Sequence, residues 1–488
     1  MGRTTTIVKR AKRDANKYEP EPQDDLTFPF ETYVAAVYQG EADEAMLKHA
    51  LEEALADVPI AAGVIVRTHQ NTMQVEVDHD GAGVPFTVQS SDDLADRELA
   101  QILDQGDVDD DGCSSRVCRW VLENARERAH AVSELSDEGR IGIEAHVCEP
   151  VTRVRVTKAR RCYVVSVQVS HLVGDAWSVF LLWDAWSRAY ASLSANSNEV
   201  ATVASNSVWW DSARFCENLP KSRPGCTPEF MPFDKAWPVW LRERAELVKA
   251  QAEHGRDDGC TLWLRLSEDG MRLLRESSGG KSFDVLMSML SPENVRWFRF
   301  AYDSRISHPD ADSSHWFGKG AYRLYGRAGV NIDSIEASDV RRALRPDGSA
   351  SDVPTRDDVV HGSYLAASYW SREPATFPAG NAMPAFGSST GRPFFPAFFL
   401  PHLQYMHVPP ALDSDGVFAY TRRVSGQYMV AAYGSAHQLG HIAMEVRRRT
   451  SECGLVEGAC GAFEVHVGTA CWCRPPPRLL VARAAEAA

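Results

Sequence analysis

The stretch CYVVSVQVSHLVGDAWSVFLLWDAWSRAY, residues 162–190, decides how this chain is interpreted. Residues 162–170 are rich in valine and predict a β-strand, whereas residues 177–190 have the apolar spacing of a helix. His171 follows the strand directly, and Gly174 permits a tight turn before the helix. Two interpretations of His171 are open: a hydrogen-bonded side chain at a buried strand end, or a catalytic base at the start of an active-site loop.

The overall composition is that of a soluble globular protein. The chain has 488 residues, enough for two or three domains, with 44% hydrophobic and 24% charged residues. Its formal net charge of −14 argues against a nucleic-acid partner, because binding phosphates requires clustered lysine and arginine. No run approaches the about 18 apolar residues of a transmembrane helix, and the first residues lack the apolar core of a secretory signal. We therefore expect a cytoplasmic protein without a transmembrane segment.

The chain begins with a basic segment. Residues 1–25 predict a disordered arm with the cations Lys9, Arg10, Lys12 and Arg13. Gly2 and Thr6 have the spacing of a myristoylation signal, and a lipid beside a basic patch would form a membrane anchor. The bulky Arg3 directly after Gly2 favours the disordered arm.

The cysteines near the C-terminus raise the question of a metal site. The 11 cysteines are scattered and, without a signal peptide, indicate reduced thiols. Four thiolates near the C-terminus could in principle hold zinc: Cys453, Cys460, Cys471 and Cys473. Their spacing does not match a known zinc module, so we expect no metal site and an irregular, cysteine-containing tail over residues 451–488.

Helix and strand signals alternate on both sides of a long proline-containing stretch. Asp43 is placed to cap a helix with Leu47, Leu51, Ala54 and Leu55 on one face, which Pro59 would end. Residues 61–88 predict three strands, and residues 282–290, 295–305 and 415–424 predict a helix and two strands of a second half. This pattern predicts an α/β protein with an N-terminal domain over 26–205, a crossover linker over 206–258 and a C-terminal domain over 259–450.

The motif His171-Leu-Val-Gly-Asp175-Ala176 after a strand resembles the HxxxD signature of the BAHD acyl-CoA-dependent acyltransferases, with Ala176 in place of the usual glycine. The resemblance continues in order along roughly residues 26–430. Segments that carry it are LKHALEEALADVPIAAGVI (47–65), DHDGAGVPFTV (78–88), SFDVLMSML (282–290), FAYDSRISHP (300–309) and HWFGKGAY (315–322). Within FAYDSRISHP, Asp303 and Arg305 keep the family's Asp-x-Arg pattern.

The family's second signature, Asp-Phe-Gly-Trp-Gly, is degenerate in this chain. The corresponding segment is AFGSSTGRPFF (385–395), in which Phe386 and Gly387 are retained. Ala385 and Ser388 replace the aspartate and the tryptophan. The chain therefore resembles a divergent member, in which the segment near the coenzyme A site has changed.

The resemblance implies a fold and a chemistry. It implies two chloramphenicol-acetyltransferase-like αβ domains joined by a long crossover, with a channel between them. His171 would be the general base, and Asp175 a structural or orienting residue that forms an ion pair with Arg305. An acyl-CoA would be the co-substrate, and a small, secondary-metabolite-like alcohol or amine would be the acceptor. The enzyme would be a monomer that binds no cofactor and forms no covalent acyl-enzyme. An unperturbed imidazole, with a pKa near 6.5, suits this general-base role.

Three alternatives remain at the level of sequence. Gly387-Ser-Ser389-Thr-Gly391 fits the nucleophile elbow of serine hydrolases, although prolines follow it where a helix is needed. A peptide-synthetase condensation domain would share the fold, but it usually has a second histidine where this chain has Ser170. A non-catalytic relative that kept the fold and binds a small metabolite would also tolerate the degenerate second signature.

Overall fold

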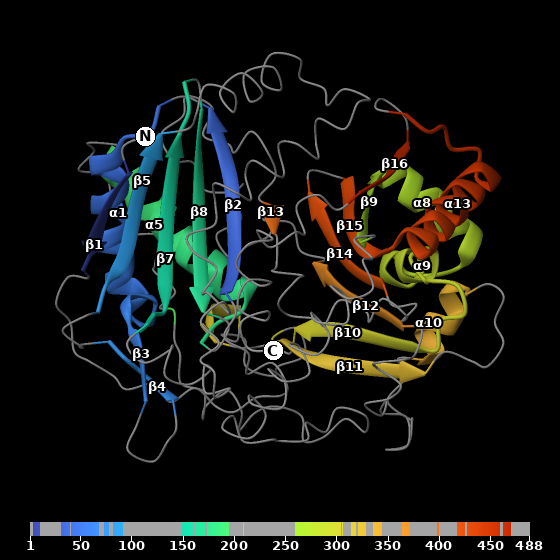
Figure 1. Cartoon of the computed structure of the whole chain (residues 1–488), viewed down its shortest axis with the longest axis horizontal. Coiled ribbons are helices and arrows are strands. Elements are labelled where there is room, and N and C mark those ends of the chain that lie inside the picture. Colours follow the sequence, from blue (N-terminus) through green and yellow to red (C-terminus); the bar gives the residue numbers. More distant parts are fainter. Residues whose placement is uncertain are drawn as a thin grey trace, which may run out of the picture.

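A computed structural model of the chain contains two large β-sheets side by side, each covered by helices on one face, and a third, small sheet (Figure 1). The structure describes residues 3–9, 31–39, 41–67, 73–77, 82–90, 149–160, 162–170, 173–194, 208, 259–303, 305, 314–318, 321–327, 335–343, 364–370, 398–399, 417–424, 427–458 and 462–469.

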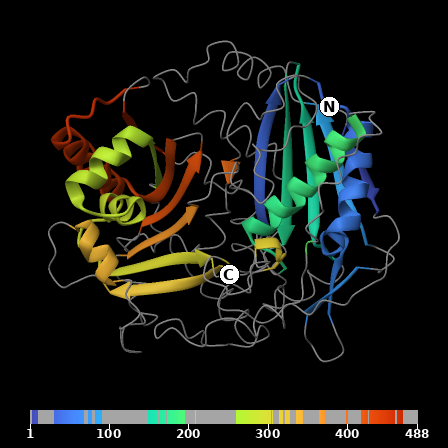
Figure 2. The same cartoon turned by 180° about the vertical axis from the view of Figure 1, so that it is seen from behind.

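The N-terminal sheet has six strands in the order β1-β5-β7-β8-β2-β13. These strands are β1 (Arg3–Val8), β5 (Val84–Ser90), β7 (Thr152–Lys158), β8 (Cys162–Ser170), β2 (Glu31–Gln39) and β13 (Phe398–Phe399). β8 is the valine-rich strand expected from the sequence, and it lies between β7 and β2, antiparallel to both. Helices α1 (Glu44–Asp57) and α5 (Ala176–Ser194) cover one face of the sheet (Figure 2).

The first helix forms as its sequence predicts. The side chain of Asp43 accepts a hydrogen bond from the N–H of Met46 at 2.9 Å and so caps α1. Leu47, Leu51 and Leu55 are buried on one face, and the 3-10 helix η1 (Pro59–Ala62) follows. The strands expected within residues 61–88 are also confirmed. They are β3 (Val64–Arg67), β4 (Met73–Glu76) and β5, and β6 (Glu149–Pro150) pairs with β3 in a small sheet of order β4-β3-β6.

The C-terminal sheet has seven strands in the order β11-β10-β12-β14-β15-β9-β16. These are β11 (Ala321–Arg327), β10 (Trp297–Asp303), β12 (Tyr364–Trp370), β14 (Val417–Val424), β15 (Gln427–Ser435), β9 (Gly259–Ser267) and β16 (Phe463–Thr469). Its helices are α8 (Glu268–Ser278), α9 (Ser282–Met289), α10 (Ala337–Ala343) and α13 (Ala436–Glu452). Figures 1 and 2 both show these helices on the side turned away from the N-terminal sheet. The expected helix and strands, here α9, β10 and β14, are confirmed.

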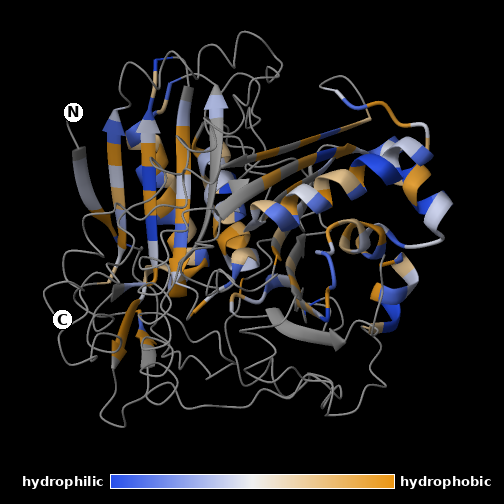
Figure 3. Ribbon diagram, turned by 45° about the vertical axis from the view of Figure 1, so that its right-hand side comes forward, coloured by the Kyte–Doolittle hydropathy of each residue, from blue (hydrophilic) through white to orange (hydrophobic). Residues whose placement is uncertain are grey.

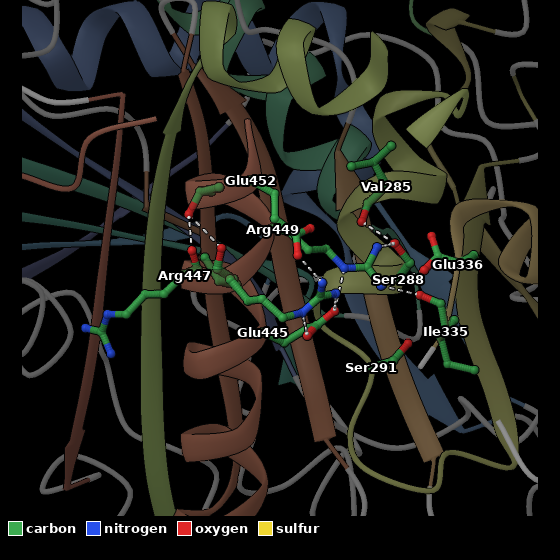
Figure 4. A network of polar contacts seen from close by, with 12 residues as sticks. Val285, Ser288, Ser291, Ile335, Glu336, Glu445, Arg447, Arg449 and Glu452 are labelled. Atoms are coloured by element: carbon green, nitrogen blue, oxygen red, sulfur yellow. Dashed lines mark hydrogen bonds and ion pairs between the residues drawn. The ribbon is translucent and has the colours of Figure 1, made fainter. Parts of the chain in front are cut away.

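A buried arginine holds the helices of this half together. The guanidinium of Arg449 on α13 donates to the Glu445 carboxylate at 2.5 Å, to Ser288 Oγ on α9 at 3.0 Å and to the carbonyl of Ile335 before α10 at 2.6 Å (Figure 4). Only 7% of the Arg449 side chain is exposed. Because charge-assisted hydrogen bonds are directional, this side chain fixes the relative positions of three elements.

Each sheet has its own hydrophobic core. Alternate residues of β8, namely Val165, Val167 and Val169, point into the N-terminal core beneath α1 and α5. In the C-terminal core, Leu262, Leu264 and Leu266 of β9 pack under the four helices. The strands accordingly show alternating hydrophobic and hydrophilic bands (Figure 3). Two separate cores explain why the chain divides into two halves.

One strand from the later part of the chain joins the N-terminal sheet. β13, from the later part of the chain, pairs antiparallel with β2 at the edge of the N-terminal sheet, with Phe398 opposite Ala35 and Phe399 opposite Val34. The division of the sequence into two domains is therefore not a clean division in space.

Both ends of the chain differ from expectation. Arg3–Val8, predicted as part of a disordered arm, is an edge strand that pairs with β5 and buries Val8 in the N-terminal core. The predicted irregular tail contains β16, in which Phe463 and Val465 are buried and Val467 is exposed, the alternation of an edge strand. Both segments pair along the edge of a sheet, β1 with β5 and β16 with β9.

Candidate active site

The turn between β8 and α5, residues Ser170–Asp175, is the centre of the candidate site. The carbonyl of Ser170 accepts hydrogen bonds from the N–H groups of Val173 and Gly174, both at 3.0 Å. The N–H of Ser170 in turn donates to the carbonyl of Val151 at 2.8 Å. His171 and Leu172 lie outside the described residues, but the nearest described residues before and after them, Ser170 and Val173, are joined by a hydrogen bond.

Asp175 begins helix α5 with a reciprocal cap. Its Oδ1 accepts from the N–H of Ser178 at 3.2 Å, and Ser178 Oγ lies 3.3 Å from the N–H of Asp175. This is the geometry of a capping box, with serine at the position usually taken by glutamate or glutamine. The pattern Asp-x-x-Ser sets where the helix starts, one residue after Asp175.

The structure brings Asp175 and Arg305 together in a buried ion pair. Arg305 Nη1 is 2.8 Å from Asp175 Oδ2, and Nη2 is 3.0 Å from Oδ1. The exposed fractions of the two side chains are 2% for Arg305 and 7% for Asp175. Nη2 also donates to the carbonyl of Gly318 at 2.6 Å, and the guanidinium lies 5.1 Å from the ring centroid of Trp316. A bidentate pair with further acceptors offsets much of the cost of burying two charges.

The partners of Asp175 and Ser178 come from the other half of the chain. Residues 314–318, in the connection between β10 and β11, lie against the start of α5 (Figure 2, gold segment below the green helix). The indole N–H of Trp177 donates to the carbonyl of Ser314 at 2.7 Å. Phe317 is fully buried, and it packs in the N-terminal core although the strands that flank it in the sequence, β10 and β11, belong to the C-terminal sheet. We call residues 314–318 the docking segment.

Two glycines leave no room for a side chain, one in the turn and one in the docking segment. A Cβ on Gly174 would lie 2.8 Å from the Cβ of Ser178, and a Cβ on Gly318 would lie 2.3 Å from the ring of Trp316. Both distances are far below van der Waals contact. Any side chain at either position would displace the turn or the docking segment.

Helix α5 is anchored on its other faces by indole hydrogen bonds. Trp183 donates to the hydroxyl of Tyr38 on β2 at 3.2 Å, and Trp186 donates to the carbonyl of Leu47 on α1 at 2.9 Å. Burial raises the pKa of Tyr38 well above its ordinary value, so this hydroxyl remains protonated. These contacts make α5 a fixed support for the β8–α5 turn.

One titratable group on α5 lies near the docking segment. Burial raises the pKa of Asp184, while the nearby charges of Arg188 and His315 oppose that shift. Arg188 Nη2 is 2.9 Å from Asp184 Oδ2, one helical turn further along α5. Asp184 therefore contributes a partly compensated charge to the face of α5 that meets the C-terminal half.

Several residues singled out from the sequence cannot be placed. His171, Phe386 and Gly387 lie outside the described residues, as does Ser389 of the hydrolase alternative. No role was predicted from the sequence for Ser178 or Gly318, which lie 140 residues apart. The capping-box spacing of Asp175 and Ser178 was a local signal that could have drawn attention to the serine.

The described residues also bear on metal binding and membrane insertion. In the described ranges, no three His, Cys, Asp or Glu side chains are grouped so as to hold a metal ion. Of the four C-terminal cysteines, Cys453 alone is described, and it ends α13 as a free thiol. No helix in the described part of the chain is both long and apolar enough to span a bilayer.

Comparison with known proteins gives a match at the level of structure. No protein-family model matches the sequence, and no curated protein matches it by sequence. Among solved structures, vinorine synthase is similar with a TM-score of 0.56 and 13% identity, over 91% of this chain and 97% of that chain. TRI101 of F. graminearum, in its apo form, is similar with a TM-score of 0.53 and 12% identity, over 93% of this chain and 100% of that chain.

A third structure is TRI101 of F. sporotrichioides complexed with coenzyme A and T-2. Its TM-score is 0.51 at 11% identity, over 88% of this chain and 97% of that chain. Vinorine synthase and TRI101 are BAHD acyltransferases. The matches extend over nearly the whole of both chains, which excludes similarity limited to one half. The chain therefore has the mixed α/β, two-domain fold of the chloramphenicol-acetyltransferase type, in the form found in BAHD acyltransferases.

Proposed function

We propose that this protein is an acyl-CoA-dependent acyltransferase that acylates a hydroxyl or amine of a small, secondary-metabolite-like molecule. One observation carries the proposal: the chain just after His171 is clamped where the two halves meet, by Asp175 with Arg305 and by Ser178 with Gly318. Further support comes from TRI101, whose structures are complexed with coenzyme A together with T-2 or deoxynivalenol. In this proposal, acyl-CoA and acceptor meet at His171 in a channel between the halves.

The proposed reaction needs one general base. Neutral His171 accepts the proton of the acceptor's hydroxyl or amine as the oxygen or nitrogen attacks the thioester carbonyl carbon. The tetrahedral intermediate collapses, the carbon–sulfur bond breaks, and the coenzyme A thiolate leaves and takes the proton from the imidazolium. A positioned general base of this kind contributes about 10²–10⁴ in rate. Asp175 has a structural role in the proposal, because both of its carboxylate oxygens are already hydrogen-bonded.

The test is a thiol-release assay with a panel of acyl-CoAs and of alcohol or amine acceptors. We expect acceptor-dependent release by the wild-type protein and at least a hundredfold loss in His171→Ala, with an unchanged melting temperature. His437→Ala, on the exposed first turn of α13, is the matched control and should keep full activity. Absence of turnover across the panel, with saturable binding of a small metabolite, would favour the non-catalytic alternative. Full activity in His171→Ala would contradict the assignment of the base.

The proposal extends to a monomeric enzyme located in the cytoplasm. Sedimentation velocity of the purified chain tests the oligomeric state, and fractionation of expressing cells tests the location. A dimer, or recovery in the membrane fraction, would contradict these two points without affecting the chemistry.

A further inference from the structure

The hydroxyl of Ser178 lies where the β8–α5 turn and the docking segment meet. Ser178 Oγ is 3.1 Å from both the N–H and the carbonyl oxygen of Gly318, 140 residues away in the sequence. It is also 3.3 Å from the N–H of Asp175 and 3.3 Å from Asp175 Oδ1. Ser178 is fully buried, so these protein groups are its hydrogen-bond partners in place of water.

The bonding capacity of the hydroxyl matches this environment. One hydroxyl can accept two hydrogen bonds and donate one. The N–H groups of Gly318 and Asp175 supply the two donors, and either Gly318 O or Asp175 Oδ1 accepts the proton. Arg305 Nη2 also donates to both Asp175 Oδ1 and Gly318 O. Whichever of these two oxygens the Ser178 hydroxyl does not bond to therefore still has a donor. An alanine at position 178 would leave the Gly318 N–H as a buried donor that has lost this acceptor.

Ser178 is packed directly against the β8–α5 turn. The missing Cβ of Gly174 leaves the space that Ser178 Cβ occupies, and Gly174 N–H donates to Ser170 O at the end of β8. A continuous path of contacts therefore runs from Gly318 through Ser178 and Gly174 to Ser170. His171 is the next residue after Ser170.

We propose that Ser178 is a positioning residue that couples the docking segment of the C-terminal half to the β8–α5 turn and so fixes the place from which His171 acts. This inference rests on the proposed acyltransferase function. It assigns to Ser178 a role different from that of the Asp175–Arg305 ion pair. The ion pair holds the two halves together, whereas the serine hydroxyl sets the register between the turn and Gly318.

The test compares Ser178→Ala with Ser187→Ala in the intact chain. Ser187 is a matched control because it is a buried serine on the same helix whose hydroxyl bonds only to Asp184 O within that helix, at 3.0 Å. For Ser178→Ala we expect kcat to fall about tenfold to a hundredfold with the KM for acyl-CoA nearly unchanged, because a displaced base lowers the rate of the chemical step. Ser187→Ala should keep the wild-type kcat. Assays are run well below the melting temperature of each variant, so that loss of folded protein does not contribute.

A second measurement does not depend on turnover. Hydrogen–deuterium exchange of peptides covering residues 162–176 and 314–322 should be faster in Ser178→Ala than in wild type, and unchanged in Ser187→Ala. Trp177→Phe, which removes the bond to Ser314 O, should show a smaller effect of the same kind. Turnover by wild type that Ser178→Ala leaves intact would overturn the inference alone, as would unchanged exchange in both peptides. No turnover by wild type would overturn the proposed function, and this inference with it.

Discussion

Asp175 and Arg305, 130 residues apart in the sequence, form a bidentate ion pair with N–O distances of 2.8 and 3.0 Å at the junction of the two halves. Neither side chain is more than 7% exposed. Removing one partner would leave the other charge buried and unpaired. This pair is therefore the first target for testing how the halves are held together.

Asp175→Ala should destabilise the protein strongly. Loss of the carboxylate leaves the buried Arg305 uncompensated, at a cost of about 3–5 kcal/mol in the free energy of unfolding. Urea denaturation, followed by circular dichroism, measures the change. The control is Asp269→Ala, which removes an exposed carboxylate 3.5 Å from Arg272 and should cost less than about 1 kcal/mol. Equal stability of Asp175→Ala and wild type would show that the pair does not stabilise the fold.

Gly174→Ala and Gly440→Ala should have opposite effects. The new methyl group at position 174 would lie 2.8 Å from Ser178 Cβ, and such overpacking costs about 1–3 kcal/mol. Gly440 lies within α13 with no atom within 4 Å of an added Cβ, so alanine there should stabilise the protein by about 0.5–1 kcal/mol. Thermal denaturation of both variants tests the pair. A stable, fully active Gly174→Ala variant would contradict the tight packing described for the turn.

Phe317→Ala should destabilise the N-terminal half although the residue belongs to a loop of the C-terminal half. Phe317 is fully buried in the N-terminal core, and removing a buried phenylalanine ring costs about 3–5 kcal/mol. Val456→Ala, at a position 71% exposed, is the control and should be nearly neutral. Hydrogen exchange should rise in α5 and β8. A rise confined to peptides of the C-terminal sheet would show that Phe317 does not support the N-terminal core.

Acid should weaken the network around α13. Hydrogen bonds from Arg448 lower the pKa of Glu445 from an ordinary 4.5 to about 2; burial opposes this and Arg449 adds to it. Because the pKa is lower in the folded state, the stabilisation is complete above about pH 4.5 and is lost as the pH falls towards about 2.

Glu445→Gln isolates this contribution. The variant should be less stable than wild type at neutral pH, by about 1 kcal/mol for a partly exposed pair, and the difference should shrink below pH 4. Unfolding free energies of both proteins at several pH values between 7 and 2 give the comparison. A difference that is independent of pH would mean that the Glu445 carboxylate does not titrate as its contacts indicate.

The sequence predicted those features that depend on local patterns. The valine alternation of β8, the Asp43 cap of α1 and the apolar spacing of α9 all depend on residues close together in the chain, and the structure contains each element. β1, β16 and β13 were not predicted, although each pairs with the edge of a sheet. β13 has only two residues and β1 lies in a basic segment, whereas the alternation of Phe463, Val465 and Val467 in β16 was a local strand signal that the prediction of an irregular tail overlooked.

In the candidate site, too, local features could be predicted from the sequence and long-range contacts could not. The Asp-x-x-Ser spacing at Asp175 and Ser178 is visible in the sequence, and the family resemblance pointed to Arg305 as a partner of Asp175. Nothing local predicts that Ser178 meets Gly318, or that Phe317 fills the core of the opposite half. These contacts depend on how the β10–β11 connection crosses between two sheets.

That crossing limits how the protein can be divided. A fragment that ended before β9 would lack Phe317, Arg305 and β13, and would carry an unfilled hole beneath α5 and an unpaired acidic group at its first turn. The complementary fragment would expose Phe317 and Arg305 without the core and the carboxylate that they contact in the intact chain. We expect neither fragment to be soluble when expressed alone and both to be rescued by co-expression. We therefore expect the two halves to fold and unfold together, as a single cooperative unit.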